Sequence, residues 1–184
     1  MTRVYLGLGA NIEPASSLKA GIFELEQCFG KLNMSPIYLA PAVGIDGPDF
    51  HNMVVGFDCQ LSYAQLIRWI ADTETKYGRQ RPADPNSKPT SHGLDMDLLL
   101  FGNMVDDTKN VPRVDILTCA YVLQPLLDIA PDLMHPKQGE RLQDINAITD
   151  PTHRYFLVAL GCLTLDVSVW HPVRCKLLAD ADSC

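Results

Sequence analysis

The sequence predicts an α+β fold of the ferredoxin-like type, with a mostly antiparallel sheet and helices packed on one face. Short apolar segments of strand character alternate with longer segments of helical periodicity, in the order β-α-β-β-α-β of the split βαβ unit. The chain has 184 residues, of which 47% are hydrophobic and 20% are charged. This length and composition suffice for one buried core, so we expect a single domain over residues 1–184.

The first three strands and the first helix are predicted within residues 4–59. Residues 4–8 form an apolar strand, and a helix over residues 17–29 ends at Gly30. Residues 34–39 and 53–59 are the next two strands, and the segment between them contains the glycines and prolines of a loop.

The second helix and the fourth strand follow. Ser62 and Gln65 have the spacing of a capping box, which opens a helix that reaches residue 77. Residues 93–101 are an apolar strand, and Thr118 is expected to cap a third helix that continues through residue 128.

The fourth predicted strand carries two carboxylates at positions i and i+2. Because side chains alternate along a strand, Asp95 and Asp97 point to the same side, with Cα atoms about 7 Å apart. Two like charges this close resist burial unless a cation or proton joins them. Mg²⁺ fits, because it is usually held by one or two carboxylates plus substrate phosphates. The pair therefore predicts Mg²⁺-assisted handling of a phosphate-bearing substrate; the alternative is an edge strand with two solvated acids.

Cationic side chains precede this strand. Arg79 and Arg81 follow the second helix, and Lys88 lies in the Pro-rich, polar loop 82–92. A guanidinium binds phosphate oxygens bidentately, whereas lysine acts as a point charge. These residues favour a phosphate site, although the two arginines can also complement the dipole at the helix C-terminus.

The chain resembles the 6-hydroxymethyl-7,8-dihydropterin pyrophosphokinases, folate-pathway enzymes that transfer diphosphate from ATP to a pterin alcohol. The resemblance covers residues 1–131 and rests on landmarks that occur in the family's order. These landmarks are Gly9-Ala10-Asn11, the 41–44 loop, Pro48-Asp49-Phe50-His51-Asn52, residues 74–81, residues 94–102, Val111-Pro112 and residues 123–131. Each motif is weak by itself, whereas the ordered set is specific.

The resemblance implies ATP as co-substrate, a pterin acceptor and a set of site residues. It implies that two Mg²⁺ ions are held by Asp95 and Asp97. It implies transfer residues Arg79, Arg81, Lys88 and His92. It implies ATP-side residues Glu74, Leu98 and Arg113, and pterin-side residues Pro41, Val43, Phe50, Asn52 and Tyr121. The substrate hydroxyl is then the nucleophile, so no serine or cysteine nucleophile is required.

Several positions depart from the family pattern, among them Val114, where the family often has an aromatic residue. His92 stands where the family usually has arginine, Arg113 where it usually has histidine, and Cys119 at a later cationic position. Either cations such as Lys88 compensate, or the chain is a divergent paralogue that binds pterin or nucleotide without efficient transfer. A metal-dependent nucleotide-sugar transferase is a less favoured alternative, because the sequence shows no doubly wound nucleotide domain.

Bulk properties limit the partners and the location. The net charge of −7 argues against a nucleic-acid surface, and no apolar run approaches the ~20 residues that span a bilayer. The six cysteines lack metal-binding spacing, and the first residues enter a strand rather than a secretory leader. We therefore expect reduced thiols, a cytoplasmic protein and small-molecule partners. The oligomeric state and the role of residues 149–184 stay open.

Overall fold

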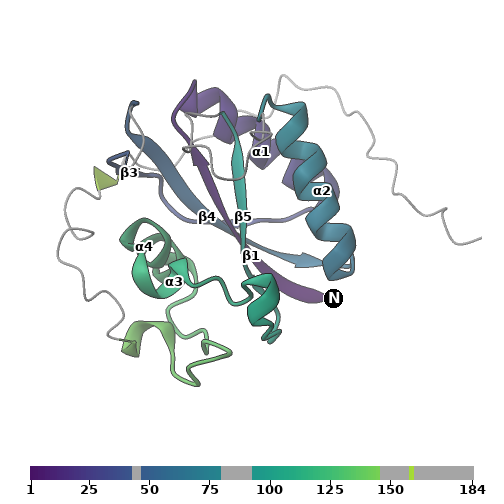
Figure 1. The fold of residues 1–184 in the computed structure, drawn as a ribbon, viewed down its shortest axis with the longest axis vertical. Helices are drawn as coiled ribbons and strands as arrows, with labels where there is room; N and C mark the ends of the chain where they lie inside the picture. Colours follow the sequence, from purple (N-terminus) through teal and green to yellow (C-terminus); the bar gives the residue numbers. More distant parts are fainter. Residues whose placement is uncertain (43–46, 80–92, 146–157, 160–184) are drawn as a thin grey trace, which may run out of the picture.

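The protein is built on an antiparallel sheet, seen in a computed structural model that describes residues 1–42, 47–79, 93–145 and 158–159. β1 (Thr2–Ala10) lies at the centre, between β5 (Asp95–Phe101) and β4 (Phe50–Cys59). On its far side, β4 pairs with β2 (Asn33–Met34) and β3 (Tyr38–Ala40). The order β5-β1-β4-β3 is the one expected for a split βαβ unit, and it confirms the predicted α+β class (Figure 1).

Smaller elements complete the described part. β6 (Val158–Ala159) pairs with β3 at the edge of the sheet. Two 3₁₀ turns follow β5 in the chain, at Asp107–Lys109 and Leu142–Asp144.

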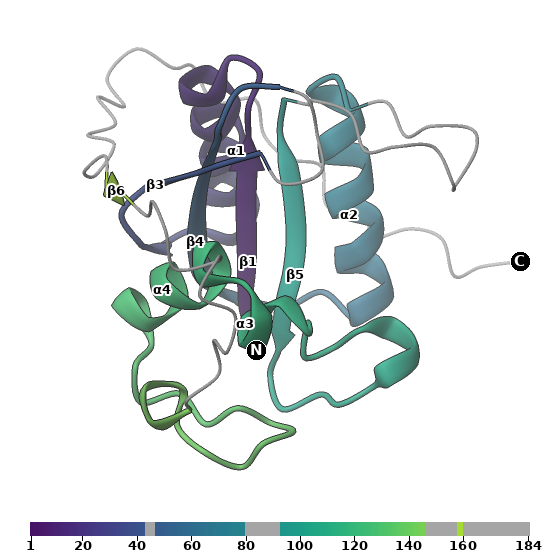
Figure 2. The same ribbon diagram turned by 60° about the vertical axis from the view of Figure 1, so that its left-hand side comes forward.

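Helices cover both faces of the sheet, so the expectation of helices on one face is wrong. α1 (Pro14–Phe29) and α2 (Tyr63–Lys76) pack on one face, and α3 (Asp115–Thr118) and α4 (Ala120–Ile129) on the other (Figures 1 and 2). The reason is that the central strands carry apolar side chains on both faces of the sheet. A strand that is apolar on both faces needs a cover on each.

Consecutive strand residues show this division. Leu6 and Val55 belong to the core beneath α1 and α2, whereas Tyr5 and Val54 belong to the core beneath α3 and α4. All four side chains are at most 7% exposed. The sheet is therefore the shared middle layer of two hydrophobic cores.

The predicted helix signals are confirmed at α1 and α2 but not at α4. Gly30 ends α1 with φ 77°, and Ser62 and Gln65 form the reciprocal capping box of α2. Cys119, not Thr118, is the N-cap of α4, and it makes no side-chain capping bond. Thr118 is the last residue of α3, where its hydroxyl donates to the carbonyl of Val114 at 3.4 Å.

The strand expected over residues 34–39 is divided into β2 and β3. Pro36 lies between them and has no N–H to donate to a ladder. Ser35 maintains the link to β4 instead. Its backbone nitrogen donates to the carbonyl of Val54 at 3.0 Å, and its hydroxyl accepts from the nitrogen of Val54 at 2.9 Å.

Two bulk expectations can be compared with the described residues. Cys28, Cys59 and Cys119 are free thiols there, as expected for reduced cysteines. Within the same residues, no helix has the length and hydropathy to cross a bilayer.

Candidate active site

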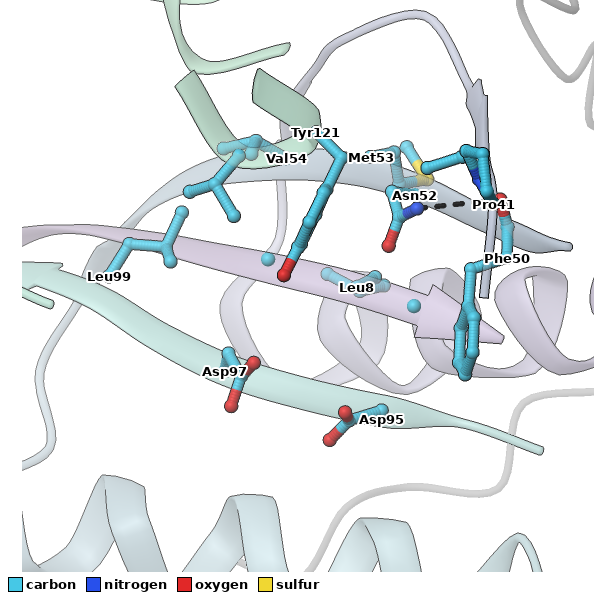
Figure 3. Close-up of a pocket in the computed structure, with 14 residues that line it drawn as sticks. Leu8, Pro41, Phe50, Asn52, Met53, Val54, Asp95, Asp97, Leu99 and Tyr121 are labelled. Atoms are coloured by element: carbon cyan, nitrogen blue, oxygen red, sulfur yellow. Dashed lines mark hydrogen bonds between the residues drawn. The ribbon is translucent and has the colours of Figure 1, made fainter. Parts of the chain in front are cut away.

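A hollow of about 210 Å³ opens on the face of the sheet that carries α3 and α4. Strands β1, β4 and β5 form its floor and sides, and the start of α4 overhangs it (Figure 3). The structure brings together here six predicted site residues: Pro41, Phe50, Asn52, Asp95, Asp97 and Tyr121. Acidic side chains on β5 therefore face polar and aromatic side chains from β4 and α4 across one cavity.

The floor of the hollow is open because β1 has glycines there. Gly9 pairs with Asp95 on one side and with Asn52 on the other, and Gly7 pairs with Asp97. A Cβ atom on Gly9 would lie only 3.2 Å from the side-chain oxygen of Asn52. Gly9 belongs to one of the landmarks of the family resemblance, but neither glycine was predicted to be a site residue, although their i, i+2 spacing matches that of the aspartates.

Each aspartate of the pair has a guanidinium partner. Arg79 forms an ion pair with Asp95, and the Nη2 atom of Arg113 lies 3.1 Å from Oδ1 of Asp97. Desolvation by the surrounding protein raises the pKa of Asp97, whereas the charges of Arg113 and Arg79 oppose this rise. The two carboxylates line the hollow, whereas Arg79 and Arg113, which pair with them, are not among its lining residues.

Glu74 lies behind this wall rather than in it. It is 2% exposed, forms an ion pair with Arg79 and accepts a hydrogen bond from the backbone nitrogen of Met96 at 2.9 Å. Its carboxylate thereby connects α2 to the strand that carries the aspartates. In this structure it contacts protein groups around the hollow and is not among the lining residues.

The opposite side of the hollow offers an amide and two aromatic rings. The Asn52 nitrogen donates to the carbonyl of Phe50 in a long contact of 3.4 Å, and Figure 3 shows the side-chain oxygen of Asn52 directed into the hollow. Tyr121 reaches down from α4 above β1. Burial, followed by a hydrogen bond with Cys119, raises the pKa of the Tyr121 hydroxyl above its ordinary value.

The remaining predicted site residues do not line the hollow with described side chains. Leu98 is 7% exposed and packs in the core beneath α1 and α2, so only its backbone is available to a ligand on the α4 side. Val43, Arg81, Lys88 and His92 lie outside the described residues.

The donor set fits a magnesium ion that shares its coordination with a substrate. Among the described residues, no group of three or more His, Cys, Asp or Glu side chains is placed to hold a metal by itself. Mg²⁺ does not require one, since one or two carboxylates with phosphate oxygens and water are its usual ligands. Asp95 and Asp97 provide two such carboxylates at the wall of a hollow.

Comparison with known proteins gives consistent matches. The profile of the 7,8-dihydro-6-hydroxymethylpterin-pyrophosphokinase (HPPK) family matches residues 5–131, which include every residue of the hollow. The 2-amino-4-hydroxy-6-hydroxymethyldihydropteridine pyrophosphokinase of Pseudomonas aeruginosa is 34% identical over 151 residues, which cover 79% of this chain and 90% of that protein. The protein of the same name from Methylorubrum extorquens is 32% identical over 158 residues, covering 83% and 96%. The folic acid synthesis protein fol1 of Schizosaccharomyces pombe is 27% identical over 146 residues, 76% of this chain and 19% of that longer protein.

Proposed function

This chain belongs to the 7,8-dihydro-6-hydroxymethylpterin-pyrophosphokinase family and is a pyrophosphokinase, and we propose that it transfers diphosphate from ATP to the hydroxymethyl group of 6-hydroxymethyl-7,8-dihydropterin in folate biosynthesis. One observation carries the proposal for this chain. A single hollow has paired carboxylates on β5 and, across the glycine floor, an amide and aromatic rings. The side of the hollow with the carboxylates suits a metal-bound triphosphate. The side with the amide and the rings suits a flat, polar heterocycle.

On the acidic side, Asp95 and Asp97 would hold two Mg²⁺ ions jointly with the triphosphate of ATP. When bound, Mg²⁺ neutralises negative charge on the phosphates and so lowers the cost of attack at phosphorus. Arg79 and Arg113 stand beside the two carboxylates and supply further positive charge to phosphate oxygens. We also include in the proposal Arg81, Lys88 and His92 as cationic or polar groups of the phosphate side.

On the other side, Asn52 would recognise the pterin. Its amide can donate and accept hydrogen bonds, which suits the mixed donor and acceptor edge of that ring system. Phe50 and Tyr121 offer flat faces for stacking, and Pro41 contributes to the rim. The acceptor hydroxyl, held between the two halves, releases its proton to water and forms a bond to the β-phosphorus. The bond from that phosphorus to the α–β bridging oxygen breaks, and AMP leaves.

The test is the rate of AMP release from ATP with 6-hydroxymethyl-7,8-dihydropterin, with and without Mg²⁺. We expect Mg²⁺-dependent release that the Asp97→Ala variant reduces by more than about 100-fold. Loss of a residue that contacts the metal directly lowers activity more than loss of a residue that only holds such a ligand in place. Asp132→Ala is the matched control, since Asp132 is an exposed aspartate that pairs with Arg141 outside the hollow.

Two outcomes would contradict the proposed reaction. Pterin binding without AMP release would make the chain a binding-only paralogue. Full activity in Asp97→Ala would remove the paired carboxylates from the metal site.

A further inference from the structure

Arg113 is held between two carboxylates, one of which, Asp97, lines the hollow. Its Nη2 atom lies 3.1 Å from Oδ1 of Asp97, and its Nε atom lies 2.6 Å from Oδ2 of Asp115. The backbone nitrogen of Arg113 also donates to the carbonyl of Leu99 on β5 at 2.9 Å. Three contacts therefore fix this arginine, two through its side chain and one through its backbone, and only one of them uses a predicted metal ligand.

Asp95 has an equivalent arrangement. Arg79 forms ion pairs with Asp95 and with the buried Glu74. Both predicted metal ligands are thus paired with arginines that have a second carboxylate to hold them in place. A metal ion and a guanidinium compete for the same carboxylate oxygens, so each arginine contact opposes metal binding.

We propose that Arg113 couples metal binding to nucleotide binding by exchanging Asp97 for a phosphate of the incoming nucleotide. The inference rests on the proposed function for the identity of both ligands. Once Asp97 turns to a metal, Arg113 keeps its contact with Asp115 and its freed Nη2 group needs an anionic partner. A nucleotide phosphate supplies that partner, and guanidinium groups bind phosphate well.

The exchange has a thermodynamic consequence. A metal alone must break the contact of Arg113 with Asp97 without compensation, whereas a metal with a nucleotide restores a partner to the arginine. Metal and nucleotide must therefore strengthen each other's binding, and the coupling is reciprocal. Arg113 would contact the nucleotide directly, whereas its effect on the metal passes through Asp97.

The experiment measures the affinity for Mn²⁺, used as the probe metal, with and without a non-hydrolysable ATP analogue. We expect Arg113→Gln to bind Mn²⁺ alone more tightly than the unaltered protein. We also expect the gain in Mn²⁺ affinity given by the analogue to shrink by about fivefold or more, the lower end of typical couplings between sites. A merely structural role would not raise the affinity for the metal alone.

Arg141→Gln is the matched control. Arg141 also pairs with two aspartates, Asp132 and Asp144, but neither of them lines the hollow. The control variant loses the same charge and should leave both Mn²⁺ affinities unchanged. Arg113→Lys guards against a folding defect, because it keeps the positive charge while a single ammonium replaces the guanidinium between Asp97 and Asp115. We expect its Mn²⁺ affinities to lie between those of the unaltered protein and those of Arg113→Gln.

Unchanged or weaker binding of Mn²⁺ alone in both Arg113 variants, with the effect of the analogue intact, would overturn the inference. The two proposals fail separately. If the protein transfers diphosphate and the Arg113 variants leave the coupling between Mn²⁺ and the ATP analogue unaltered, only the exchange at Arg113 is contradicted. If the variants alter this coupling and no diphosphate is transferred, the exchange is supported and the proposed reaction is contradicted.

Discussion

The Oε1 atom of Glu74 accepts a hydrogen bond of 2.9 Å from the backbone nitrogen of Met96, the residue that separates Asp95 from Asp97. Glu74 belongs to α2, on the opposite face of the sheet from the hollow. Its contact is made at the edge of β5 that does not pair with β1. A buried carboxylate on one side of the sheet therefore fixes the strand whose carboxylates project from the other.

Two substitutions of Glu74 should separate the stabilisation that comes from this hydrogen bond from the stabilisation that comes from the negative charge. Glu74→Ala leaves the nitrogen of Met96 without its acceptor, and we expect the free energy of unfolding to fall by about 1–3 kcal/mol. Glu74→Gln keeps an acceptor oxygen and should cost less. Urea denaturation of the two variants measures both values. Equal losses would mean that the charge opposite Arg79, rather than the bond to Met96, carries the stabilisation.

The glycine floor gives a second prediction, on substrate affinity. Gly9→Ala places a Cβ atom 3.2 Å from Oδ1 of Asn52, which forces the amide to move. We expect pterin affinity, measured by titration, to fall by about tenfold, equivalent to ~1.4 kcal/mol. Gly7→Ala is the matched control within the same strand, because its nearest neighbour, a methyl group of Leu99, lies at an ordinary 3.6 Å. Equal affinities in the two variants would contradict the role of Gly9 in placing Asn52.

His135 gives a prediction about acid stability. The imidazole is 2% exposed, and its Nδ1 accepts a hydrogen bond from the nitrogen of Gln138 at 3.2 Å. Its Nε2 has no hydrogen-bond partner among the described residues. Burial, and then the charge of Lys137, lower the pKa of His135 below its ordinary value. The folded protein therefore disfavours the protonated form.

The sign of the pH dependence follows from linkage. Below about pH 6.5 the unfolded chain binds a proton at this histidine that the folded chain does not, so the free energy of unfolding falls as the pH decreases. The stabilisation is fully present above that pH. Urea denaturation at pH 7.5 and pH 5.5 should show a smaller decrease for His135→Gln than for the unaltered protein. The same decrease in both proteins would show that other groups cause the acid sensitivity.

Local chemistry explains the parts of the fold and site that could be predicted. The capping box at Ser62 and the stop at Gly30 depend on neighbouring residues, and both are present as predicted. The alternation of side chains along a strand places Asp95 and Asp97 on one side, whatever the rest of the fold does.

The parts that could not be predicted depend on contacts between distant segments. Gly7 and Gly9 look in sequence like weak points of a strand, and only the register with β5 and β4 makes them a floor beneath the acids and Asn52. The pairing of Arg113 with Asp97 likewise needs the chain to return to β5 after a 3₁₀ turn. The position of α4 on the second face depends on a core that its buried side chains share with Tyr5, Val54 and Leu99, residues of three strands far apart in the sequence.

The central claim is that two phosphates move together from ATP to the pterin. The most direct measurement is the full product balance of one reaction with MgATP and 6-hydroxymethyl-7,8-dihydropterin, resolved by chromatography and mass spectrometry. We predict AMP and a pterin diphosphate in equal amounts, with no ADP formed in step with the pterin product. ADP together with a pterin monophosphate, or nucleotide hydrolysis that leaves the pterin unchanged, would contradict the account.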